Sequence, residues 1–419
     1  MKNKIMIAFA AYNWAETHRM ISIGEEFLNN GYEVYALGEG KYDFLLKNVD
    51  FHRVYVNEDK KWYTNERKEK LMKMDIYGNN YCTENELRKI INEEIKIINS
   101  IDPKVIITGY RTTLSVSAKI TKTPLVWVLS AVVSKKFFEG GFASIPENRG
   151  GFFKKLKSND SKKYSKLVLN NNSSSKIWNN ILIENNLPIF KSDIDIFEGD
   201  INLLSDAPEL FPFIVPSKKY QFTYPLINNN EIAMPKGIDN FLNKQRLSIF
   251  ITLGSSGNKQ LFLKILDCLK KIDASIIVAK TNILKDSDIQ DYPKNYFFAE
   301  SFPHIDIAKK TDLSIIHGGQ GTIYSTLIAG KPFIGIPLFS EQQYNLEVIS
   351  KMNSGICLLQ KELNEENLIS AINQIIKNKK INDNAKKLSK IIYKYYKDPD
   401  YSANKRAYNI IKNSIIDTK

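Results

Sequence analysis

The feature that most constrains this chain is a repeated alternation of apolar strands with amphipathic helices. Residues 4–11 (KIMIAFAA) are apolar almost throughout, as in a parallel strand that is covered on both faces. Residues 17–30 then carry apolar side chains at helical spacing, and Gly31 follows as the residue after the helix. The next strand begins directly with YEVYALG. This order predicts a right-handed βαβ unit in a parallel sheet.

The same alternation continues through both halves of the chain. In the first half it predicts a helix at 85–100, a strand at 103–108, a helix at 112–120 and a strand at 124–130. In the second half it predicts strands at 247–256, 275–279, 296–301, 313–319 and 333–338, with helices at 258–271, 321–330, 343–352 and 364–378. A chain of 419 residues exceeds one typical core. We therefore predict the α/β class, with two Rossmann-like doubly wound domains.

The domain boundaries follow from a change of composition. Residues 228–237 (NNNEIAMPKG) are polar and contain Pro and Gly, which is typical of a linker. We expect an N-terminal domain at 1–227, a linker at 228–244, a C-terminal domain at 245–395, and a last helix at 396–419 that could cross back to the first domain. Two such domains commonly form a ligand-binding cleft between them.

Charge and cysteine content limit the class of protein. The 59 Lys and Arg against 46 Asp and Glu give a net charge of +13, which either favours anionic partners or reflects a lysine-rich composition. No recognisable nucleic-acid module accompanies this charge. Three distant cysteines favour a reducing compartment over disulfides or zinc. The short, interrupted apolar run at the N-terminus fits a strand better than a signal peptide, so we expect a cytoplasmic protein without a membrane span.

The most informative segment runs from His317 to Ile349 (HGGQGTIYSTLIAGKPFIGIPLFSEQQYNLEVI). A predicted strand ends at His317, the chain turns through three glycines, and a helix starts near Thr322. Glycines let a backbone approach an oxyanion closely, and the N–H groups at a helix N-terminus attract phosphate. The segment therefore indicates a diphosphate site.

This arrangement resembles the GT-B UDP-glycosyltransferase superfamily, glycosyltransferase families 1 and 28, and is nearest the sterol and antibiotic type. The match comprises His317, Gly318, Gly319, Gly321, Thr322, Gly330, Pro332, Pro337, Glu341, Gln342 and Asn345. Flanking segments are also similar: LGSS at 253–256, SFPH at 301–304, and YQFTYPL at 220–226. The resemblance implies a GT-B fold, and a transferase that moves a hexose from a nucleoside diphosphate to an acceptor hydroxyl with inversion.

The same resemblance implies the donor site. The diphosphate would be held by His317, Gly318, Gly319, Gln320, Gly321 and Thr322, and from the facing turn by Gly254, Ser255 and Ser256. Phe302 would border the base, and Glu341 and Gln342 would bind sugar hydroxyls. The implied donor is a UDP-sugar or a dTDP-sugar, with no metal and no other cofactor. Ser325 stands where many relatives carry a ribose-binding Glu, which leaves the ribose contacts open.

The transfer also needs a general base for the acceptor hydroxyl, which in the superfamily follows the first strand. The family's glycine and proline are both absent around residues 13–19. Counting back from Gly31 places Glu16 at the position of the base. His18 is the chemical alternative, because its unperturbed pKa is near ~6.5.

A cluster of basic and aromatic residues at 135–157 completes the predicted features, with Lys135, Lys136, Phe137 and Phe138 at its start. It could touch an anionic membrane, at its inner face, or form a loop over the acceptor site. Two other functions share this fold. A non-catalytic auxiliary protein that binds a partner transferase would be favoured by loss of the phosphate motif. A nucleotide-sugar epimerase would need no acceptor-side base.

Overall fold

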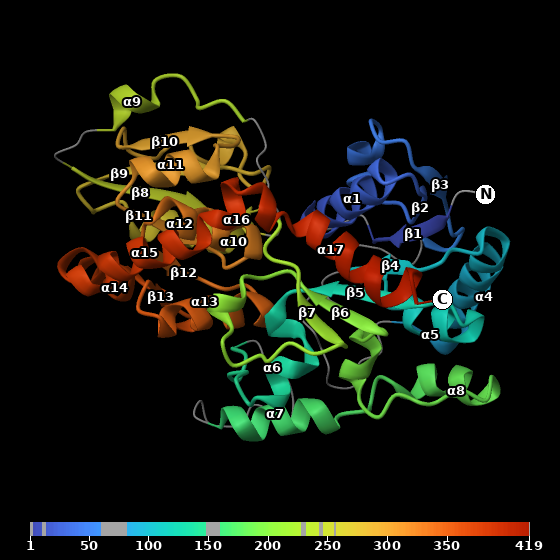
Figure 1. Cartoon of the computed structure of the whole chain (residues 1–419). Coiled ribbons are helices and arrows are strands. Elements are labelled where there is room, and N and C mark those ends of the chain that lie inside the picture. The colour runs from blue at the N-terminus through green and yellow to red at the C-terminus, as the bar shows by residue number, and fades with distance from the viewer. Residues whose placement is uncertain are drawn as a thin grey trace. The chain divides into compact units, whose positions relative to one another are not determined.

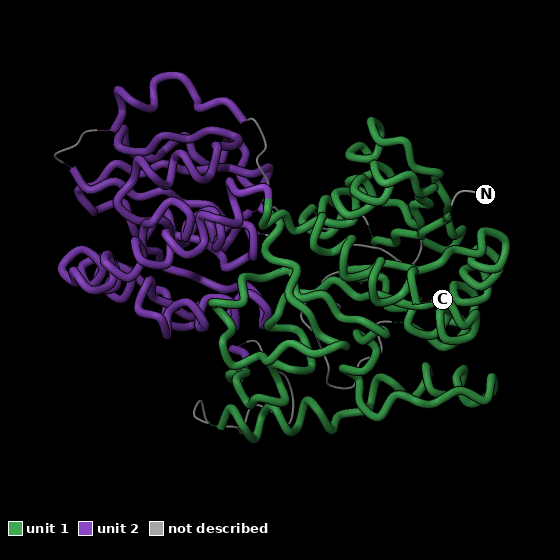
Figure 2. The backbone as a smooth tube through the Cα atoms, viewed as in Figure 1, with its two compact units in different colours: residues 1–145, 149–226, 400–419 green, residues 146–148, 227–399 purple. Residues whose placement is uncertain are grey.

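The computed structural model describes residues 3–10, 14–59, 82–147, 160–227, 232–242, 246–254 and 257–418. The chain forms two compact units, coloured separately in Figure 2. Unit 1 contains residues 1–145, 149–226 and 400–419, and unit 2 contains residues 146–148 and 227–399. Each unit is built on its own parallel sheet.

In the described residues of unit 1, seven parallel strands form a sheet in the order β3-β2-β1-β4-β5-β6-β7. They are β1 (Lys4–Ala8), β2 (Glu33–Leu37), β3 (His52–Val54), β4 (Ile106–Thr108), β5 (Leu125–Leu129), β6 (Ile201–Leu204) and β7 (Tyr220–Phe222). The strand order reverses between β1 and β4, which pair in register from Met6 with Ile106. In sheets of this kind ligands bind beyond the carboxyl ends of the strands at such a reversal.

Helices flank the sheet of unit 1 (Figure 1). They are α1 (Trp14–Asn29), α4 (Glu84–Ile101), α5 (Leu114–Thr121), α6 (Lys135–Glu139), α7 (Ser161–Asn170), α8 (Lys176–Glu184) and α17 (Ala403–Ile411). Short turns are η1 (Asp43–Leu46), η2 (Ala131–Val133), η4 (Asp193–Phe197), η5 (Pro208–Leu210) and η10 (Lys412–Ile416). Helix α4 begins with a capping box in which Thr83 and Glu86 bond reciprocally.

The end of the chain packs on its beginning. Helix α17 lies beside α1, and the ring of Tyr408 meets that of Phe27 at a centroid distance of 4.9 Å. Ala407, Tyr408 and Ile411 are buried in the same apolar cluster as Ile5 and Ile7 of β1. Residues 400–419 are therefore part of the core of unit 1.

The described residues of unit 2 form a sheet of six parallel strands in the order β10-β9-β8-β11-β12-β13. They are β8 (Leu247–Thr252), β9 (Ala274–Ala279), β10 (Tyr296–Ala299), β11 (Leu313–Ile316), β12 (Phe333–Gly335) and β13 (Gly355–Cys357). The helices are α9 (Ile238–Phe241), α10 (Lys259–Cys268), α11 (His304–Lys310), α12 (Gln320–Ala329), α13 (Ser340–Lys351), α14 (Glu365–Lys377), α15 (Lys379–Ile392) and α16 (Lys394–Lys397), with short turns η7 (Asp286–Asp288), η8 (Gln360–Glu362) and η9 (Pro399–Tyr401). The order reverses between β8 and β11.

Unit 2 also includes a short segment from the first half of the chain. The N–H of Glu147 donates to Oε1 of Gln343 at 3.0 Å, and its carboxylate accepts from the N–H groups of Gln360, at 2.7 Å, and Lys361. The second domain was predicted at 245–395, whereas unit 2 spans 227–399 and takes in residues 146–148. No pattern in the sequence indicates this connection.

Helix length and hydropathy test whether a helix could span a membrane. No helix in the described part of the chain is both long enough and apolar enough to cross a bilayer.

Candidate functional site

The glycine turn between β11 and α12 is shaped by contacts that exclude side chains. Gly318 has a φ of +89°, and a Cβ there would lie 2.7 Å from the main-chain oxygen of Gln342. Only glycine fits both constraints. By contrast, a Cβ on Gly321 would meet nothing within 4 Å, so the first turn of α12 faces open space. The N–H groups of a first helical turn lack intrahelical acceptors, which makes this turn suited to an anion.

The ring of His317 lies between two glycines, Gly319 of this turn and Gly254 of the turn after β8. A Cβ on Gly254 would come within 2.6 Å of the His317 ring, and a Cβ on Gly319 within 2.5 Å. The ring is 5% exposed, and its Nδ1 has no hydrogen-bond partner among the described residues. A buried polar atom without a partner calls for an explanation, and a bound ligand is one.

The electrostatics of His317 follow from its burial. Desolvation and, to a lesser extent, the nearby His304 lower the pKa of His317 to about 3, while the main chain of Thr252 opposes the shift. His317 is therefore neutral at physiological pH. A neutral imidazole can donate one N–H to a phosphate oxygen without adding a positive charge.

The facing turn after β8 carries Gly254. Its φ is +58°, its N–H donates to Oγ1 of Thr252 at 3.3 Å, and its carbonyl accepts from Oγ1 of Thr281 at 3.2 Å. Strands β8 and β11 lie on either side of the order reversal, so Gly254 and His317 meet at the carboxyl edge of the sheet. Ser255 and Ser256, predicted on the same turn, lie outside the described residues.

The start of α13 supports the glycine turn. Nδ2 of Asn345 donates to the Gly318 carbonyl at 3.3 Å, and Oε1 of Gln342 accepts from the N–H of Leu338 at 2.8 Å. The amide oxygen of Gln342 therefore helps to shape the loop before α13. Glu341 is half-buried in the first turn of the helix.

The predicted role of Phe302 needs correction. Its side chain has no exposed surface and packs with Phe250, at a ring distance of 5.8 Å, in a cluster with Ile277 and Ile307. The Phe302 ring itself therefore presents no surface to a nucleotide base, whereas the role of its neighbours in the loop stays a prediction. The apolar character of Phe302 reflects the packing of α11 on the sheet.

In unit 1, Glu16 follows β1, one of the two strands beside the order reversal, as Gly254 follows β8 in unit 2. It lies in the first turn of α1 and is 1% exposed. Its two carboxylate oxygens accept from the N–H of Ala10 at 3.3 and 3.4 Å, and a Cβ on Gly109 would lie 2.8 Å from its Cγ. Burial raises the pKa of Glu16 to about 8, although the N–H of Ala10 and the charge of Arg19 lower it.

His18 stands two residues further along α1. It is half-buried, its Nδ1 lies 3.4 Å from Oγ of Ser22, and burial lowers its pKa. Helical residues two apart do not face each other. Glu16 and His18 therefore point in different directions and are alternatives, not a pair.

Next to Glu16 lies a buried charge network that sequence reasoning missed. The guanidinium of Arg111 binds both oxygens of Asp59 at 2.8 Å and Oε1 of Glu94 at 2.7 Å, and all three side chains are fully buried. Thr113 and Ser117 also donate to Glu94. Burial raises the pKa of Glu94. The partners are 52 and 17 residues from Arg111, a separation that leaves no local pattern.

The described part of the basic and aromatic cluster is not an open surface. Lys135 pairs with Asp195 at 2.6 Å, and Lys136 with Glu139 at 2.7 Å. Phe137 and Phe138 are each 1% exposed. The two rings therefore present no surface to a membrane, whereas the paired side chains of Lys135 and Lys136 stay 26% and 38% exposed. Residues 148–157 lie outside the described residues.

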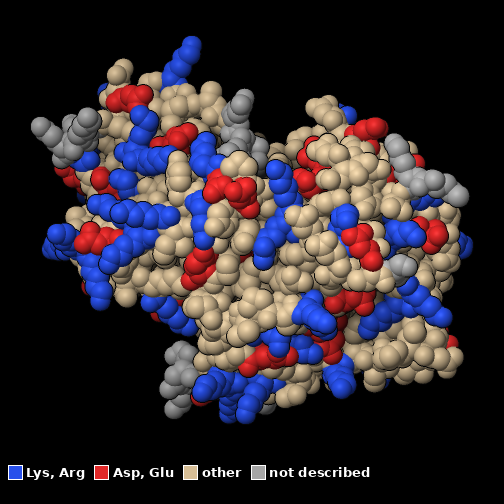
Figure 3. Space-filling view, in the orientation of Figure 1, with Lys and Arg blue, Asp and Glu red and all other residues tan. Residues whose placement is uncertain are grey.

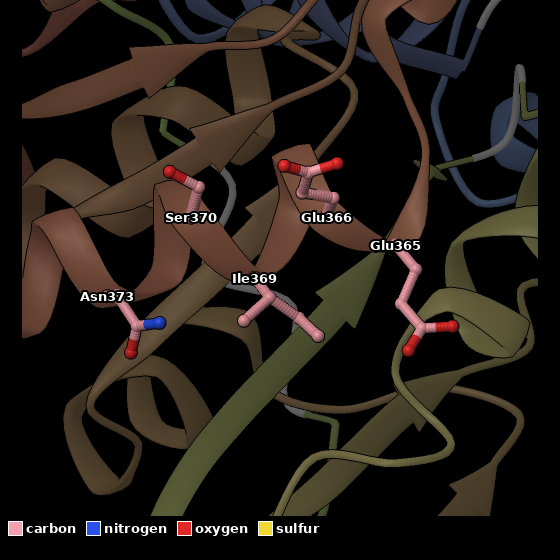
Figure 4. A pocket seen from close by; sticks show the side chains of 5 residues that line it. All are labelled: Glu365, Glu366, Ile369, Ser370 and Asn373. Atoms are coloured by element: carbon pink, nitrogen blue, oxygen red, sulfur yellow. The ribbon is translucent and has the colours of Figure 1, made fainter.

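Two surface depressions in unit 2 hold none of the motif residues. One, of about 460 Å³, is lined by Glu365, Glu366, Ile369, Ser370 and Asn373 of α14 (Figure 4). The other, of about 500 Å³, is lined by Glu365 and by residues of α10. We place the candidate site at the glycine turn. Within the described ranges, no group of three or more His, Cys, Asp or Glu side chains is arranged to hold a metal ion.

Comparisons with known proteins find glycosyltransferases over most of the chain. A family model for the glycosyltransferase family 28 C-terminal domain matches residues 248–401. A PGL/p-HBAD biosynthesis glycosyltransferase of Mycobacterium tuberculosis is 25% identical over 393 residues, covering 93% of this chain and 88% of that protein.

Solved structures share the fold of the whole chain. The calicheamicin glycosyltransferase CalG4 gives a TM-score of 0.69 at 12% identity, covering 99% of this chain and 98% of that one. The spinosyn rhamnosyltransferase SpnG, complexed with thymidine diphosphate, gives 0.64 at 14% identity, covering 94% and 96%. Both likenesses identify the two-unit arrangement of parallel sheets as the GT-B fold.

Proposed function

Because the chain belongs to the GT-B UDP-glycosyltransferase superfamily and is a glycosyltransferase, we propose that it transfers a hexose from a nucleoside-diphosphate sugar to a hydroxyl of a small-molecule or lipid acceptor. The observation that carries the proposal is the buried, neutral His317 between Gly254 and Gly319, at the N-terminus of α12. The donor is a UDP-sugar or a dTDP-sugar, and the transfer inverts the anomeric carbon.

On the donor side, the leaving diphosphate gains negative charge as the bond to the sugar breaks. The N–H groups of Gln320, Gly321 and Thr322 belong to the first turn of α12, where the helix dipole is positive. His317 adds one neutral donor. These groups stabilise the charge where it develops and need no bound cation.

Two observations bear on which nucleotide the donor carries. SpnG, a structural relative, holds thymidine diphosphate. In this chain Oγ of Ser325 donates to the Gly321 carbonyl at 2.8 Å, so this side chain is used within its own helix. Other residues must then bind the ribose, which leaves uridine and deoxythymidine diphosphates both compatible with the site.

On the acceptor side, Glu16 is the proposed general base. In its ionised form it takes the proton of the acceptor hydroxyl as the oxygen attacks the anomeric carbon and the diphosphate leaves. A pKa of about 8 makes Glu16 a much stronger base than an exposed glutamate. His18 remains the alternative base, because it is less buried and lies on the same helix.

Thermal-shift measurement tests the donor site directly. UDP, dTDP and GDP are added to the wild type, to His317→Ala, and to His52→Ala as a matched histidine control on β3 of unit 1. We expect one nucleotide to raise the melting temperature of the wild type and the control but not of His317→Ala. An equal shift in all three proteins would contradict the site.

The measurement also separates transfer from an auxiliary role. If a nucleotide binds, its sugar conjugates are incubated with the protein and release of the nucleoside diphosphate is followed. Release that depends on Glu16 or His18 supports a transferase. No shift with any nucleotide would instead favour the auxiliary protein considered from the sequence.

A further inference from the structure

Helix α15 presents one strongly basic face. Five of its residues are exposed lysines: Lys379, Lys380, Lys386, Lys387 and Lys390. They follow helical spacing in two rows, 379–386–390 and 380–387, on one side of the helix. The opposite side carries the buried residues Ile381, Ala385 and Ile392. We call these five residues the α15 lysine face.

The α15 lysine face differs from other lysines of unit 2 in its pairing. Lys271, Lys280 and Lys310 each form an ion pair at 3.1 Å or less with a nearby carboxylate. In the part of the chain that the structure describes, none of the five lysines on α15 has such a partner. Residues 379–397 contain seven lysines and one acidic residue, Asp383. The positive charge of this face is therefore not neutralised by the protein itself.

Exposed apolar side chains accompany the charge. Ile391 is 40% exposed and Tyr393, directly after α15, is 42% exposed. In Figure 3, Lys and Arg side chains gather over the part of unit 2 where Figure 1 shows α14 and α15. A Tyr and an Ile at the border of a lysine cluster suit the interface between lipid headgroups and acyl chains.

We propose that the α15 lysine face is a docking surface for an anionic lipid bilayer. Clusters of four to eight lysines on an amphipathic helix bind acidic lipids through charge alone, and the backing by Ile381 and Ile392 holds this helix rigidly in the fold. The surface is distinct from the cluster at 135–157, whose described lysines are paired within the protein.

The docking surface is compatible with access to the donor site. Oγ of Ser389 donates to the Ile328 carbonyl at 2.8 Å, so α15 packs at the C-terminal end of α12. The glycine turn is at the other end of α12, roughly 15 Å away for a ten-residue helix. A bilayer on α15 would hold unit 2 close to a lipid acceptor. The closeness to a lipid acceptor rests on the proposed function, whereas the binding of α15 to a bilayer does not.

Vesicle flotation of the full chain tests the proposal. The vesicles are pure phosphatidylcholine or contain about one third phosphatidylglycerol, at ~0.05 and ~0.5 M NaCl. We expect flotation only with the anionic vesicles at low salt. Equal flotation with neutral vesicles, or none with either, would overturn the proposal, whatever the outcome of the nucleotide measurements.

Two charge-matched variants locate the surface. Lys386→Glu/Lys387→Glu/Lys390→Glu should reduce the bound fraction at least about tenfold. Lys162→Glu/Lys163→Glu/Lys166→Glu, on exposed positions of α7, should bind as the wild type does. Loss of binding in the α7 variant alone would overturn the assignment to α15. So would tighter binding of an oligonucleotide than of anionic vesicles through the same three lysines. The melting temperature checks that both variants are folded.

Discussion

The turn after β11 in unit 2 and the turn after β1 in unit 1 both border the reversal of strand order in their own sheets, from its two different sides. Each lies at the carboxyl end of a strand beside the reversal of strand order. Around His317 the packing partners are glycines, and the buried ring is neutral. Around Glu16 the neighbours include main-chain donors and buried charges, and the carboxyl has a raised pKa. These surroundings suit the proposed roles, an anion site at one turn and a proton acceptor at the other.

The largest effect is expected at Glu16. The change Glu16→Gln keeps the shape of the side chain but removes its ability to accept a proton. We expect the kcat of sugar transfer to fall by about 10²–10⁴-fold, with nucleotide binding unchanged. Steady-state kinetics with a donor identified by thermal shift provide the measurement. If His18→Ala has the large effect and Glu16→Gln has little, the base is His18.

The buried network beside Glu16 should dominate the stability of unit 1. The change Arg111→Met leaves Asp59 and Glu94 buried without their cation, so the free energy of unfolding should fall by about 3–5 kcal/mol. Urea denaturation measures the loss. The control is Arg88→Met on α4, where Arg88 pairs with Glu84 at the surface. Its effect should be much smaller, because water and salt screen exposed pairs.

The two turns also differ in how far the sequence reveals them. His317, Gly318 and Gly319 are contiguous, because a strand leads directly into a helix, and the sequence shows that turn. Glu16 could be placed only by counting from Gly31. Arg111, Asp59 and Glu94 come from three separate segments, and only tertiary packing brings them together.

Other differences between the predicted and the observed site also arise because tertiary packing leaves no local pattern in the sequence. Sequence does not distinguish a paired lysine from an unpaired one, so it leaves open whether Lys135 and Lys136 contact a membrane or belong to a loop over the acceptor site. In the structure both are paired with nearby carboxylates. The assignment of Phe302 rests on the resemblance of the SFPH segment to the family, and such a resemblance does not show that the ring lies in the core. The alternation of strands and helices was sufficient for the fold class, since periodicity reports directly on burial.

The third prediction concerns the support of His317. The change Gly254→Ala places a Cβ 2.6 Å from the ring and should displace it, lowering nucleotide affinity about 10–100-fold. Gly237→Ala is the matched control. Its φ of +86° strains alanine in the same way, but a Cβ there meets nothing within 4 Å. Calorimetric titration compares the two, and equal affinities would show that the ring position does not matter for binding.

The smallest expected effect is a difference in pH dependence between catalysis, which involves Glu16, and nucleotide binding, which involves His317. Only the ionised form of Glu16 can act as base, so with a pKa of about 8 the kcat/KM should rise up to about tenfold between pH 7 and 9 and then level off. His317, with a pKa of about 3, is neutral throughout this range, so nucleotide affinity should stay constant. A kcat/KM that is flat from pH 7 to 9 would contradict the raised pKa of Glu16. A second contradicting result would be a change in the nucleotide affinity of the wild type between pH 7 and 9, with no such change in Gly254→Ala. That result would mean that the His317 ring takes up a proton in a range where burial should keep it neutral.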